Sequence, residues 1–349
     1  MGVFAKARGF ERVVFAQDPK ADMRAIIAIH STRLGPALGG CRIQPYRTED
    51  AALEDVTRLA ESMTWKAAAA GLDLGGGKAV LIADPARDRD EALLRAFGRA
   101  VESLNGRYIT SVDVGSGVDD MDEIRRETKW VVGVSPAYDG SGDPSPITAE
   151  GVAVSMRACA HHTWREPTLK GRRVGIQGVG KVGYHLAGIL TKEGAEVVVS
   201  DPSVDNLGRA VADYGVETIP PDQILELECD ILAPCALGGV INAETISRLK
   251  TQIVCGAANN QLAELEDAER LADAAILYAP DFIVNAGGLI SVADELIGWH
   301  RERVLQRVGK IGRTLLDVFH ISQVRNVSTA QAAVEYAKQR MRTISALNR

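Results

Sequence analysis

The sequence predicts an α/β protein of two domains with a cleft between them, the second domain being a doubly wound parallel sheet. From about residue 149, short apolar runs alternate regularly with helical stretches, which is typical of such a sheet. A break rich in proline, glycine and serine, residues 133–146, separates this part from the first half. Because 349 residues suffice for about two domains of roughly 150 residues each, we expect domains over residues 1–140 and 141–324.

Composition argues against several classes of partner and site. The formal charge of −6 and the isoelectric point near 5.6 argue against nucleic acid or an anionic membrane, since either would favour a basic face. We expect no signal peptide or membrane span, and a cytoplasmic location. Adjacent His161 and His162 would point apart on a helix, so no metal site is expected. The scattered cysteines are expected to be reduced, mostly buried thiols: Cys41, Cys159, Cys229, Cys235 and Cys255.

The first half is expected to mix strands and helices. In chain order they are a hairpin of strands 12–17 and 24–30, a helix opened by Thr48, a strand 79–83 after three glycines, a helix 89–104 and a strand 107–114. The apolar stripe of the Thr48 helix passes through Met63 and continues onto Lys66. Strand alternation puts Ser111 and Asp113 on one face. Burial of a charged group is costly, so Lys66 on a buried stripe and Asp113 in an apolar strand are both candidates for a function.

The second half is expected to repeat strand and helix in turn. A helix near residues 149–162 precedes a short strand, a glycine-rich turn, a further helix and a second strand. Later strand candidates are residues 229–236, 251–258, 274–280 and 282–286. This order predicts a parallel sheet with helical connections.

The glycine-rich turn, Gly178-x-Gly180-x-x-Gly183, has the full context of a dinucleotide site. A strand precedes it, a helix follows it, and Asp201 ends the next strand 23 residues after Gly178. The glycines permit a tight turn and close approach of a pyrophosphate to the helix N-terminus. Asp201 would accept hydrogen bonds from a ribose and repel a 2′-phosphate, which favours NAD over NADP. The alternative is an ordinary glycine-rich turn.

A second glycine run, Gly75–Gly77, stands directly before Lys78 and raises the question of a phosphate loop. Such a loop needs glycine five residues before its last glycine and serine or threonine after the lysine. Leu72 and Ala79 occupy those positions, so the match fails twice and an ATP-dependent enzyme is not supported. Lys78 can instead be a base, because burial and a nearby Lys66 would both favour its neutral amine. Spacing alone leaves a catalytic and a structural lysine equally open.

Seven segments in the same order resemble the Glu/Leu/Phe/Val amino-acid dehydrogenase family. They are "HSTRLGPALGGCR", "MTWKAAAAGLDLGGGKAV", "GRYITSVDVG", "IQGVGKVGYHL", "CDILAPCALGG", "GAANNQL" and "YAPDFIVNAGG". The resemblance extends from about residue 10 to residue 340 and is closest to the leucine-specific members. It implies a substrate domain followed by a Rossmann NAD domain, a homo-oligomer supported by the hairpin edge at residues 12–30, and a last helix, about 325–349, that packs back on the first domain.

The resemblance also implies roles for individual residues. Lys78 matches the lysine that activates water and polarises the carbon under attack, and Asp113 matches the acid that relays protons to and from the amino group. Lys66 matches the lysine that binds the substrate carboxylate, with backbone at Gly39 and Gly40. Further implied substrate contacts are Leu38, Met63, Ser111, Asn260, Leu289 and Val292. Implied NAD contacts are Thr148, Gly178, Val179, Gly180, Lys181, Val182, Gly183, Asp201, Cys235, Ala236, Ala258, Asn259 and Asn285.

The reaction implied is reversible, NAD-dependent oxidative deamination of an L-amino acid to a 2-oxo acid and ammonia. Aliphatic Leu38, Leu289 and Val292 with small Ser111 favour leucine, isoleucine and valine. Two departures favour an aromatic substrate such as phenylalanine or tryptophan instead: Ser111 and Val112 stand where leucine enzymes have Ala-Glu, and Gly77 replaces their alanine. A non-catalytic NAD-binding sensor is the alternative from another class, and the presence of Lys66, Lys78 and Asp113 argues against it.

Overall fold

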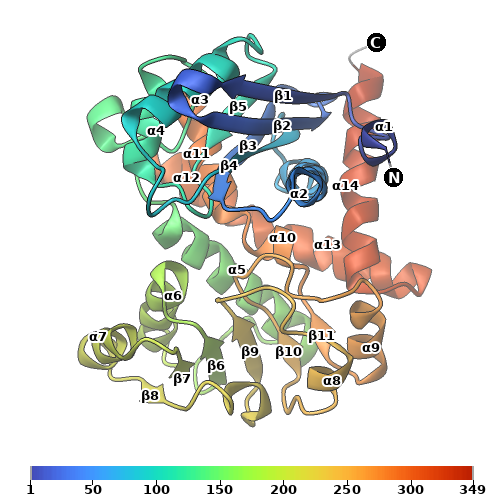
Figure 1. The fold of residues 1–349 in the computed structure, drawn as a ribbon. Coiled ribbons are helices and arrows are strands. Elements are labelled where there is room, and N and C mark those ends of the chain that lie inside the picture. The colour runs from blue at the N-terminus through green and yellow to red at the C-terminus, as the bar shows by residue number, and fades with distance from the viewer. Residues whose placement is uncertain (1, 348–349) are drawn as a thin grey trace. The chain divides into compact units, whose positions relative to one another are not determined.

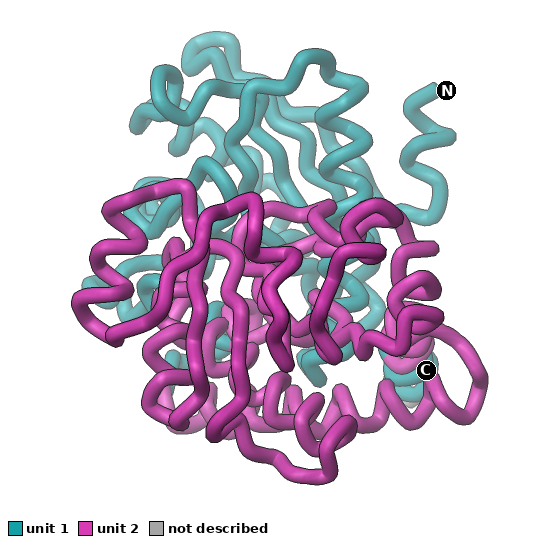
Figure 2. The backbone as a smooth tube through the Cα atoms, turned by 90° about the horizontal axis from the view of Figure 1, so that it is seen from below, with its two compact units in different colours: residues 1–144, 291–300, 337–349 teal, residues 145–290, 301–336 magenta. Residues whose placement is uncertain are grey.

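The computed structural model describes residues 2–347, which fall into two compact units (Figures 1 and 2). Unit 1 comprises residues 1–144, 291–300 and 337–349, and unit 2 comprises residues 145–290 and 301–336. The first boundary therefore lies at residue 144, at the end of the glycine-rich connection. Residues 291–300 belong to unit 1, whereas the sequence analysis had placed them in the second domain. Composition gave no sign of this return, because the segment continues an apolar helix.

Unit 1 is built on a five-stranded mixed sheet with the order β1-β2-β4-β3-β5. The strands are β1 Arg12–Asp18, β2 Met23–Ser31, β3 Ala37–Gln44, β4 Gly75–Ile82 and β5 Tyr108–Ser111. β1 and β2 form the expected antiparallel hairpin, and β3 runs parallel to both β4 and β5. The sequence analysis did not anticipate β3, since two glycines interrupt its apolar pattern. The expected strand 107–114 ends early, so Asp113 lies just beyond β5.

Helices cover both faces of this sheet. On one face α2, Glu49–Ala69, begins at the expected Thr48 cap and packs Leu53 and Val56 against Ile26 and Val80 of the sheet. On the other face, the core contains side chains of α3, Glu91–Glu102, and α4, Val118–Arg125. The remaining elements of the unit are α1 Val3–Lys6, η1 Pro19–Ala21, η2 Pro136–Tyr138 and η4 Glu295–Ile297.

The glycines before Lys78 are part of a strand, which corrects the expectation that they precede one. Gly75–Gly77 form the start of β4 and are buried. A Cβ on Gly76 would lie 2.1 Å from the backbone nitrogen of Thr64 in α2. A Cβ on Gly77 would instead meet the Tyr108 ring, on the opposite face of the sheet. The glycines therefore allow close packing of a helix on the strand, and the strand fixes the position of Lys78.

Unit 2 contains a six-stranded parallel sheet with the order β11-β10-β9-β6-β7-β8. The strands are β6 Arg173–Gln177, β7 Glu196–Ser200, β8 Glu217–Thr218, β9 Ile231–Pro234, β10 Ile253–Val254 and β11 Leu277–Tyr278. The order reverses between β6 and β9, so ligands are expected at the carboxyl ends of these two strands. The doubly wound prediction is confirmed, but the strand candidate 282–286 is wrong. Most of that segment belongs to helix α10, Asp281–Val284, which begins directly after Pro280.

The helices of unit 2 connect and cover its strands. They are α5 Ser145–Trp164, α6 Lys181–Lys192, α7 Val204–Tyr214, η3 Ile224–Glu226, α8 Ala243–Ile246, α9 Asp267–Asp273, α10, α12 Arg301–Val308 and α13 Lys310–Arg325. Two further helices have residues in both units, α11 Gly287–Asp294 and α14 Thr329–Leu347. α14 is the expected last helix, although residues 348–349 lie outside the described part of the chain. None of the helices within residues 2–347 is long and apolar enough to span a membrane.

Candidate active site

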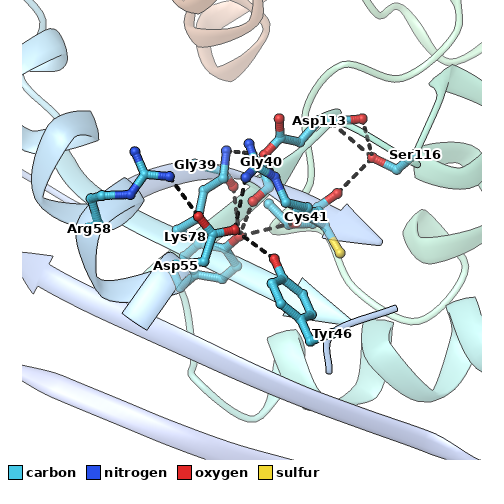
Figure 3. A network of polar contacts seen from close by, with 12 residues as sticks. Gly39, Gly40, Cys41, Tyr46, Asp55, Arg58, Lys78, Asp113 and Ser116 are labelled. Atoms are coloured by element: carbon cyan, nitrogen blue, oxygen red, sulfur yellow. Dashed lines mark hydrogen bonds and ion pairs between the residues drawn. The ribbon is translucent and has the colours of Figure 1, made fainter. Parts of the chain in front are cut away.

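An ion pair between Lys78 and Asp113 forms the centre of the site in unit 1 (Figure 3). The β4 position of Lys78 leaves its side chain 8% exposed, and that of Asp113 is 12% exposed. The loop that carries Asp113 is fixed by Ser116, whose Oγ accepts a hydrogen bond from the Asp113 backbone nitrogen at 2.9 Å. The same hydroxyl donates to the Cys41 carbonyl oxygen at 2.8 Å. Two strands and one loop therefore hold the two charges together.

The charge state of Asp113 follows from its surroundings. Burial alone would raise the pKa of this carboxyl, but the neighbouring cations Lys78 and Arg42 outweigh that effect and lower it. Arg42 contributes from 3.7 Å, the distance between its Nε and Asp113 Oδ2. Asp113 is therefore a carboxylate near neutral pH, which is the form that can accept a proton.

Behind this pair lies a charged network that the sequence analysis missed. Arg42 Nη1 donates to Asp55 Oδ2 at 2.8 Å, and the Tyr46 hydroxyl donates to the same oxygen at 2.7 Å. Arg58 donates to Asp55 Oδ1 at 2.8 Å. These contacts orient Arg42 toward Asp113 from the α2 side of the sheet. Recognition of β3 as a strand would have been the signal, because alternation puts Arg42 on the same face as Gly40.

Gly39 and Gly40 are required where the backbone approaches the pair most closely. A Cβ on Gly39 would lie 1.7 Å from the carbonyl oxygen of Gly77, and one on Gly40 would lie 2.8 Å from Asp113 Cβ. Tyr108 fixes this segment of β3, since its hydroxyl donates to the Gly39 carbonyl oxygen at 2.6 Å. The implied carboxylate-binding backbone is therefore adjacent to Asp113 in space.

The other implied substrate contacts are distributed as follows. Leu38 and Ser111 are buried on β3 and β5, where Gly40 pairs with Ser111 in the sheet. Lys66 and Met63 are half-buried on α2. Val292 is buried in unit 1, and Leu289 is buried in unit 2. The structure thus brings Gly40, Ser111, Lys78 and Asp113 together.

In unit 2 the glycine-rich turn has the geometry of an anion site. Gly178 adopts φ +92°, and a Cβ there would lie 2.7 Å from Ala236 Cβ. Gly183 packs its helix on the turn, because a Cβ would lie 1.9 Å from the Gly178 carbonyl oxygen. Nothing lies within 4 Å of a Cβ on Gly180, the residue that caps α6. No atom of the described chain therefore covers the backbone at Gly180, which leaves the N-terminus of α6 open at this residue, as the approach of a pyrophosphate requires.

Asp201 directly follows β7 and stabilises the glycine-rich turn. Its Oδ2 accepts from the Val179 backbone nitrogen at 2.8 Å, and its Oδ1 accepts from Ser203 at 2.8 Å. A carboxylate has further lone pairs, so these bonds still leave capacity for ribose hydroxyls.

A second polar group lies at the ends of β9 and β10. Asn285 Nδ2 donates to Asn259 Oδ1 at 2.8 Å and to the Ala257 carbonyl oxygen at 3.0 Å. Asn285 Oδ1 is buried and has no hydrogen-bond partner among the described residues. The carbonyl oxygen of Asn260 accepts from the Gly239 nitrogen at 2.7 Å. A buried acceptor beside Asn259 that has no partner within residues 2–347 fits the carboxamide donor of a nicotinamide.

The remaining implied cofactor residues surround the same edge of the sheet. Lys181 and Val182 form the first turn of α6, and burial raises the pKa of the Cys235 thiol after β9 to about 12. Ala258 is buried after β10, and Thr148 is buried in α5. No group of three or more metal-binding side chains occurs in the described part of the chain.

Comparison with known proteins agrees with this arrangement. Residues 10–130 match the family model "Glu/Leu/Phe/Val dehydrogenase, dimerisation domain", and residues 202–347 match "Glutamate/Leucine/Phenylalanine/Valine dehydrogenase". The leucine dehydrogenase of Thermoactinomyces intermedius is 50% identical over 95% of this chain and 91% of its own length. The phenylalanine dehydrogenase of Lysinibacillus sphaericus is 47% identical over 95% and 88% respectively. The crystal structure of L-tryptophan dehydrogenase from Nostoc punctiforme superimposes with a TM-score of 0.85 at 41% identity, covering 98% of both chains.

The two units, the Lys78–Asp113 pair and the dinucleotide turn together define an amino-acid dehydrogenase that uses a nicotinamide cofactor. The chain belongs to the Glu/Leu/Phe/Val dehydrogenase family.

Proposed function

We propose that this enzyme catalyses the reversible, NAD-dependent oxidative deamination of branched-chain L-amino acids to 2-oxo acids and ammonia. The observation that carries the proposal is the buried Lys78–Asp113 pair beside Gly40, in a chain whose second unit contains a complete dinucleotide turn. The presence of Lys66, Lys78 and Asp113 in one chain argues against a sensor without catalysis.

The protein's own groups have distinct tasks in this reaction. Asp113 accepts the proton that leaves the substrate ammonium, and Lys66 with the backbone at Gly39 and Gly40 binds the substrate carboxylate. A bound nicotinamide would supply the acceptor for the hydride that leaves the alpha carbon. Lys78 orients the water that adds to the resulting imine carbon and takes a proton from it. Asp113 returns its proton to the nitrogen and then accepts the proton of the new hydroxyl, so that the carbonyl forms, the carbon–nitrogen bond breaks and ammonia leaves.

NAD rather than NADP is the proposed cofactor. The carboxylate of Asp201 lies at the end of β7, where a ribose 2′-hydroxyl would be recognised and a 2′-phosphate repelled. Asn285 and Asn259 would hold the carboxamide of the nicotinamide ring.

A branched aliphatic side chain is the proposed specificity. Leu38 and Val292 are buried aliphatic side chains, and Ser111 is a small buried one. Gly77, which suggested an aromatic substrate, faces the Tyr108 ring on the far side of the sheet from Lys78. Its missing methyl group therefore does not widen a pocket on the Lys78 face, and the case for an aromatic ring rests on Ser111 and Val112 alone.

The assay that tests this proposal follows NADH absorbance with leucine, isoleucine, valine and phenylalanine as substrates. One methylene group is worth about 1–3 kcal/mol in an apolar pocket, so the three aliphatic substrates should differ by about 10–200-fold in kcat/KM. Phenylalanine should be poorer than all three, since close-packed aliphatic walls resist a ring. A phenylalanine or tryptophan preference would overturn the substrate assignment, and absence of turnover with every amino acid would overturn the reaction.

We also propose that the protein is a homo-oligomer assembled through unit 1. β1 is an edge strand whose outer side lacks a partner in the described chain, and its Phe15 is 56% exposed. Light scattering coupled to size-exclusion chromatography tests this, and a monomer at micromolar concentration would contradict it.

A further inference from the structure

A half-buried glutamate links two of the three chain segments of unit 1, residues 1–144 and 291–300. Glu295 lies in η4, within the returning segment 291–300, and both of its carboxylate oxygens accept hydrogen bonds. Oε2 accepts from the Gly133 backbone nitrogen at 2.9 Å. Oε1 accepts from the Ser141 backbone nitrogen at 2.8 Å and from its hydroxyl at 2.5 Å. Glu295 therefore holds the glycine-rich connection at its first residue, Gly133, and again at Ser141.

The first of these contacts reaches the candidate active site. Gly133 has φ +76°, and a Cβ at this position would lie 2.9 Å from Ser111 Oγ. Val132, one residue earlier, donates its backbone N–H to the Thr110 carbonyl oxygen of β5 at 2.9 Å. Residues 132–133 thus lie along the end of β5, two residues before Asp113. A displacement of Gly133 would therefore change the position of the Ser111 side chain.

The shape of the connection does not depend on Glu295 alone. Ser135 donates its backbone N–H to Asp122 Oδ1 at 2.9 Å, and Gly142 donates to the Val134 carbonyl oxygen at 3.1 Å. A Cβ on Gly140 would lie 2.0 Å from that same carbonyl oxygen. These contacts hold the connection independently of Glu295, whose Oε2 is the acceptor for the Gly133 amide beside β5.

The chemistry of the carboxylate is matched to this task. One carboxylate oxygen of Glu295 accepts from Gly133 and the other accepts from Ser141. Burial raises the pKa of the Glu295 carboxyl, while the hydrogen bonds from Ser141 and from the Gly133 backbone oppose that effect. A carboxamide in its place has one acceptor oxygen only, so one of the donors would face an N–H group.

We infer that Glu295 is a positioning residue for the amino-acid substrate, acting through Gly133 on Ser111 and on the loop that carries Asp113. This inference rests on the proposed function, because it names the substrate side of that site as what Glu295 controls. The residue contacts neither the ion pair nor the dinucleotide turn, so its effect should appear in amino-acid binding and leave the cofactor unaffected.

Glu295→Gln tests the inference, with Asp122→Asn as the matched control. Both changes remove one carboxylate that holds the connection, but an asparagine at 122 keeps the single acceptor that Ser135 needs. We expect Glu295→Gln to raise the amino-acid KM by about tenfold with the NAD KM changed by less than about twofold. Asp122→Asn should leave the amino-acid KM within about twofold of the parent.

Amide hydrogen exchange supplies a second readout that does not need turnover. In Glu295→Gln the Gly133 amide should exchange about tenfold faster, whereas amides in β7 of unit 2 should not change. An unchanged amino-acid KM overturns the inference whatever the exchange rate of Gly133, as does an equal effect of Asp122→Asn. A parent enzyme that oxidises no amino acid overturns the proposed function instead, and the exchange result still decides whether Glu295 holds Gly133. If Glu295→Gln does not fold, Glu295→Asp, which keeps the charge but withdraws it by one methylene, must show the same KM pattern.

Discussion

The Nε atom of Arg42 lies 3.7 Å from Asp113 Oδ2, although no described residue accepts a hydrogen bond from that Nε. The guanidinium is directed to this position by its own bond to Asp55. Arg42 therefore acts on Asp113 by charge at a distance, while Lys78 holds the carboxylate directly. The two cations together determine the pH range in which Asp113 can work as a base.

Replacement of Arg42 by methionine should move the acidic limb of the kcat/KM profile to higher pH. Arg42 lowers the pKa of Asp113, so its removal raises that pKa, and the active carboxylate is then lost at a higher pH as the solution is acidified. The measurement is the pH dependence of amino-acid oxidation at saturating NAD. Arg58→Met is the control, because Arg58 contacts Asp55 and is 55% exposed. A profile of Arg42→Met that superimposes on the parent's would refute the role of Arg42.

Lys78→Ala should lower kcat by about 10²- to 10⁴-fold, which is the usual contribution of a positioned acid–base group. NAD affinity, measured by quenching of protein fluorescence, should remain, because Lys78 is in unit 1 and the dinucleotide turn is in unit 2. Lys66→Ala should instead raise the amino-acid KM, since it is proposed to bind the substrate carboxylate. Near-normal turnover of Lys78→Ala would refute the catalytic assignment, and an unchanged KM would refute that of Lys66.

Gly77→Ala should leave the ratio of leucine to phenylalanine kcat/KM within about twofold of the parent. The added methyl group would lie 2.8 Å from Tyr108 Cδ2, on the face of the sheet opposite Lys78. Gly76→Ala should be the more destabilising change, by about 1–3 kcal/mol or more, because its methyl group would meet the backbone of Thr64 at 2.1 Å. Thermal unfolding of both variants and the substrate ratio of Gly77→Ala check these expectations. A large gain in phenylalanine activity on Gly77→Ala would show that this position does shape the pocket.

Asp201→Ser should reduce the preference for NAD over NADP by about tenfold or more, since it removes a carboxylate that repels the 2′-phosphate. It should also raise the NAD KM, because the Asp201 carboxylate holds the Val179 amide of the glycine-rich turn. Steady-state kinetics with both cofactors measure the two effects. Asp201→Asn separates them, as it removes the charge but retains an acceptor for Val179. Equal use of NAD and NADP by the parent would contradict the assignment.

Features encoded in short stretches could be predicted from the sequence. The β1–β2 hairpin, the Thr48 cap and the strand–turn–helix around Gly178 depend on neighbouring residues, and the structure confirms each of them. Lys78 and Asp113 were found by their type and by family motifs, and they form one ion pair.

Tertiary structure alone decided which distant residues meet. Periodicity did not predict β3, and so it did not predict that Arg42 lies close to Asp113. Parallel strands pair across long crossovers, so residues far apart in the sequence determine which strands are neighbours. The sequence predicted that Gly75–Gly77 precede a strand, but in the structure they lie within β4. The reason is tertiary, because a Cβ on Gly76 would collide with α2. The bond from Gly133 to Glu295 joins residues 162 positions apart. Periodicity reports which face of an element is buried, whereas the partner that covers it is determined when the whole chain folds.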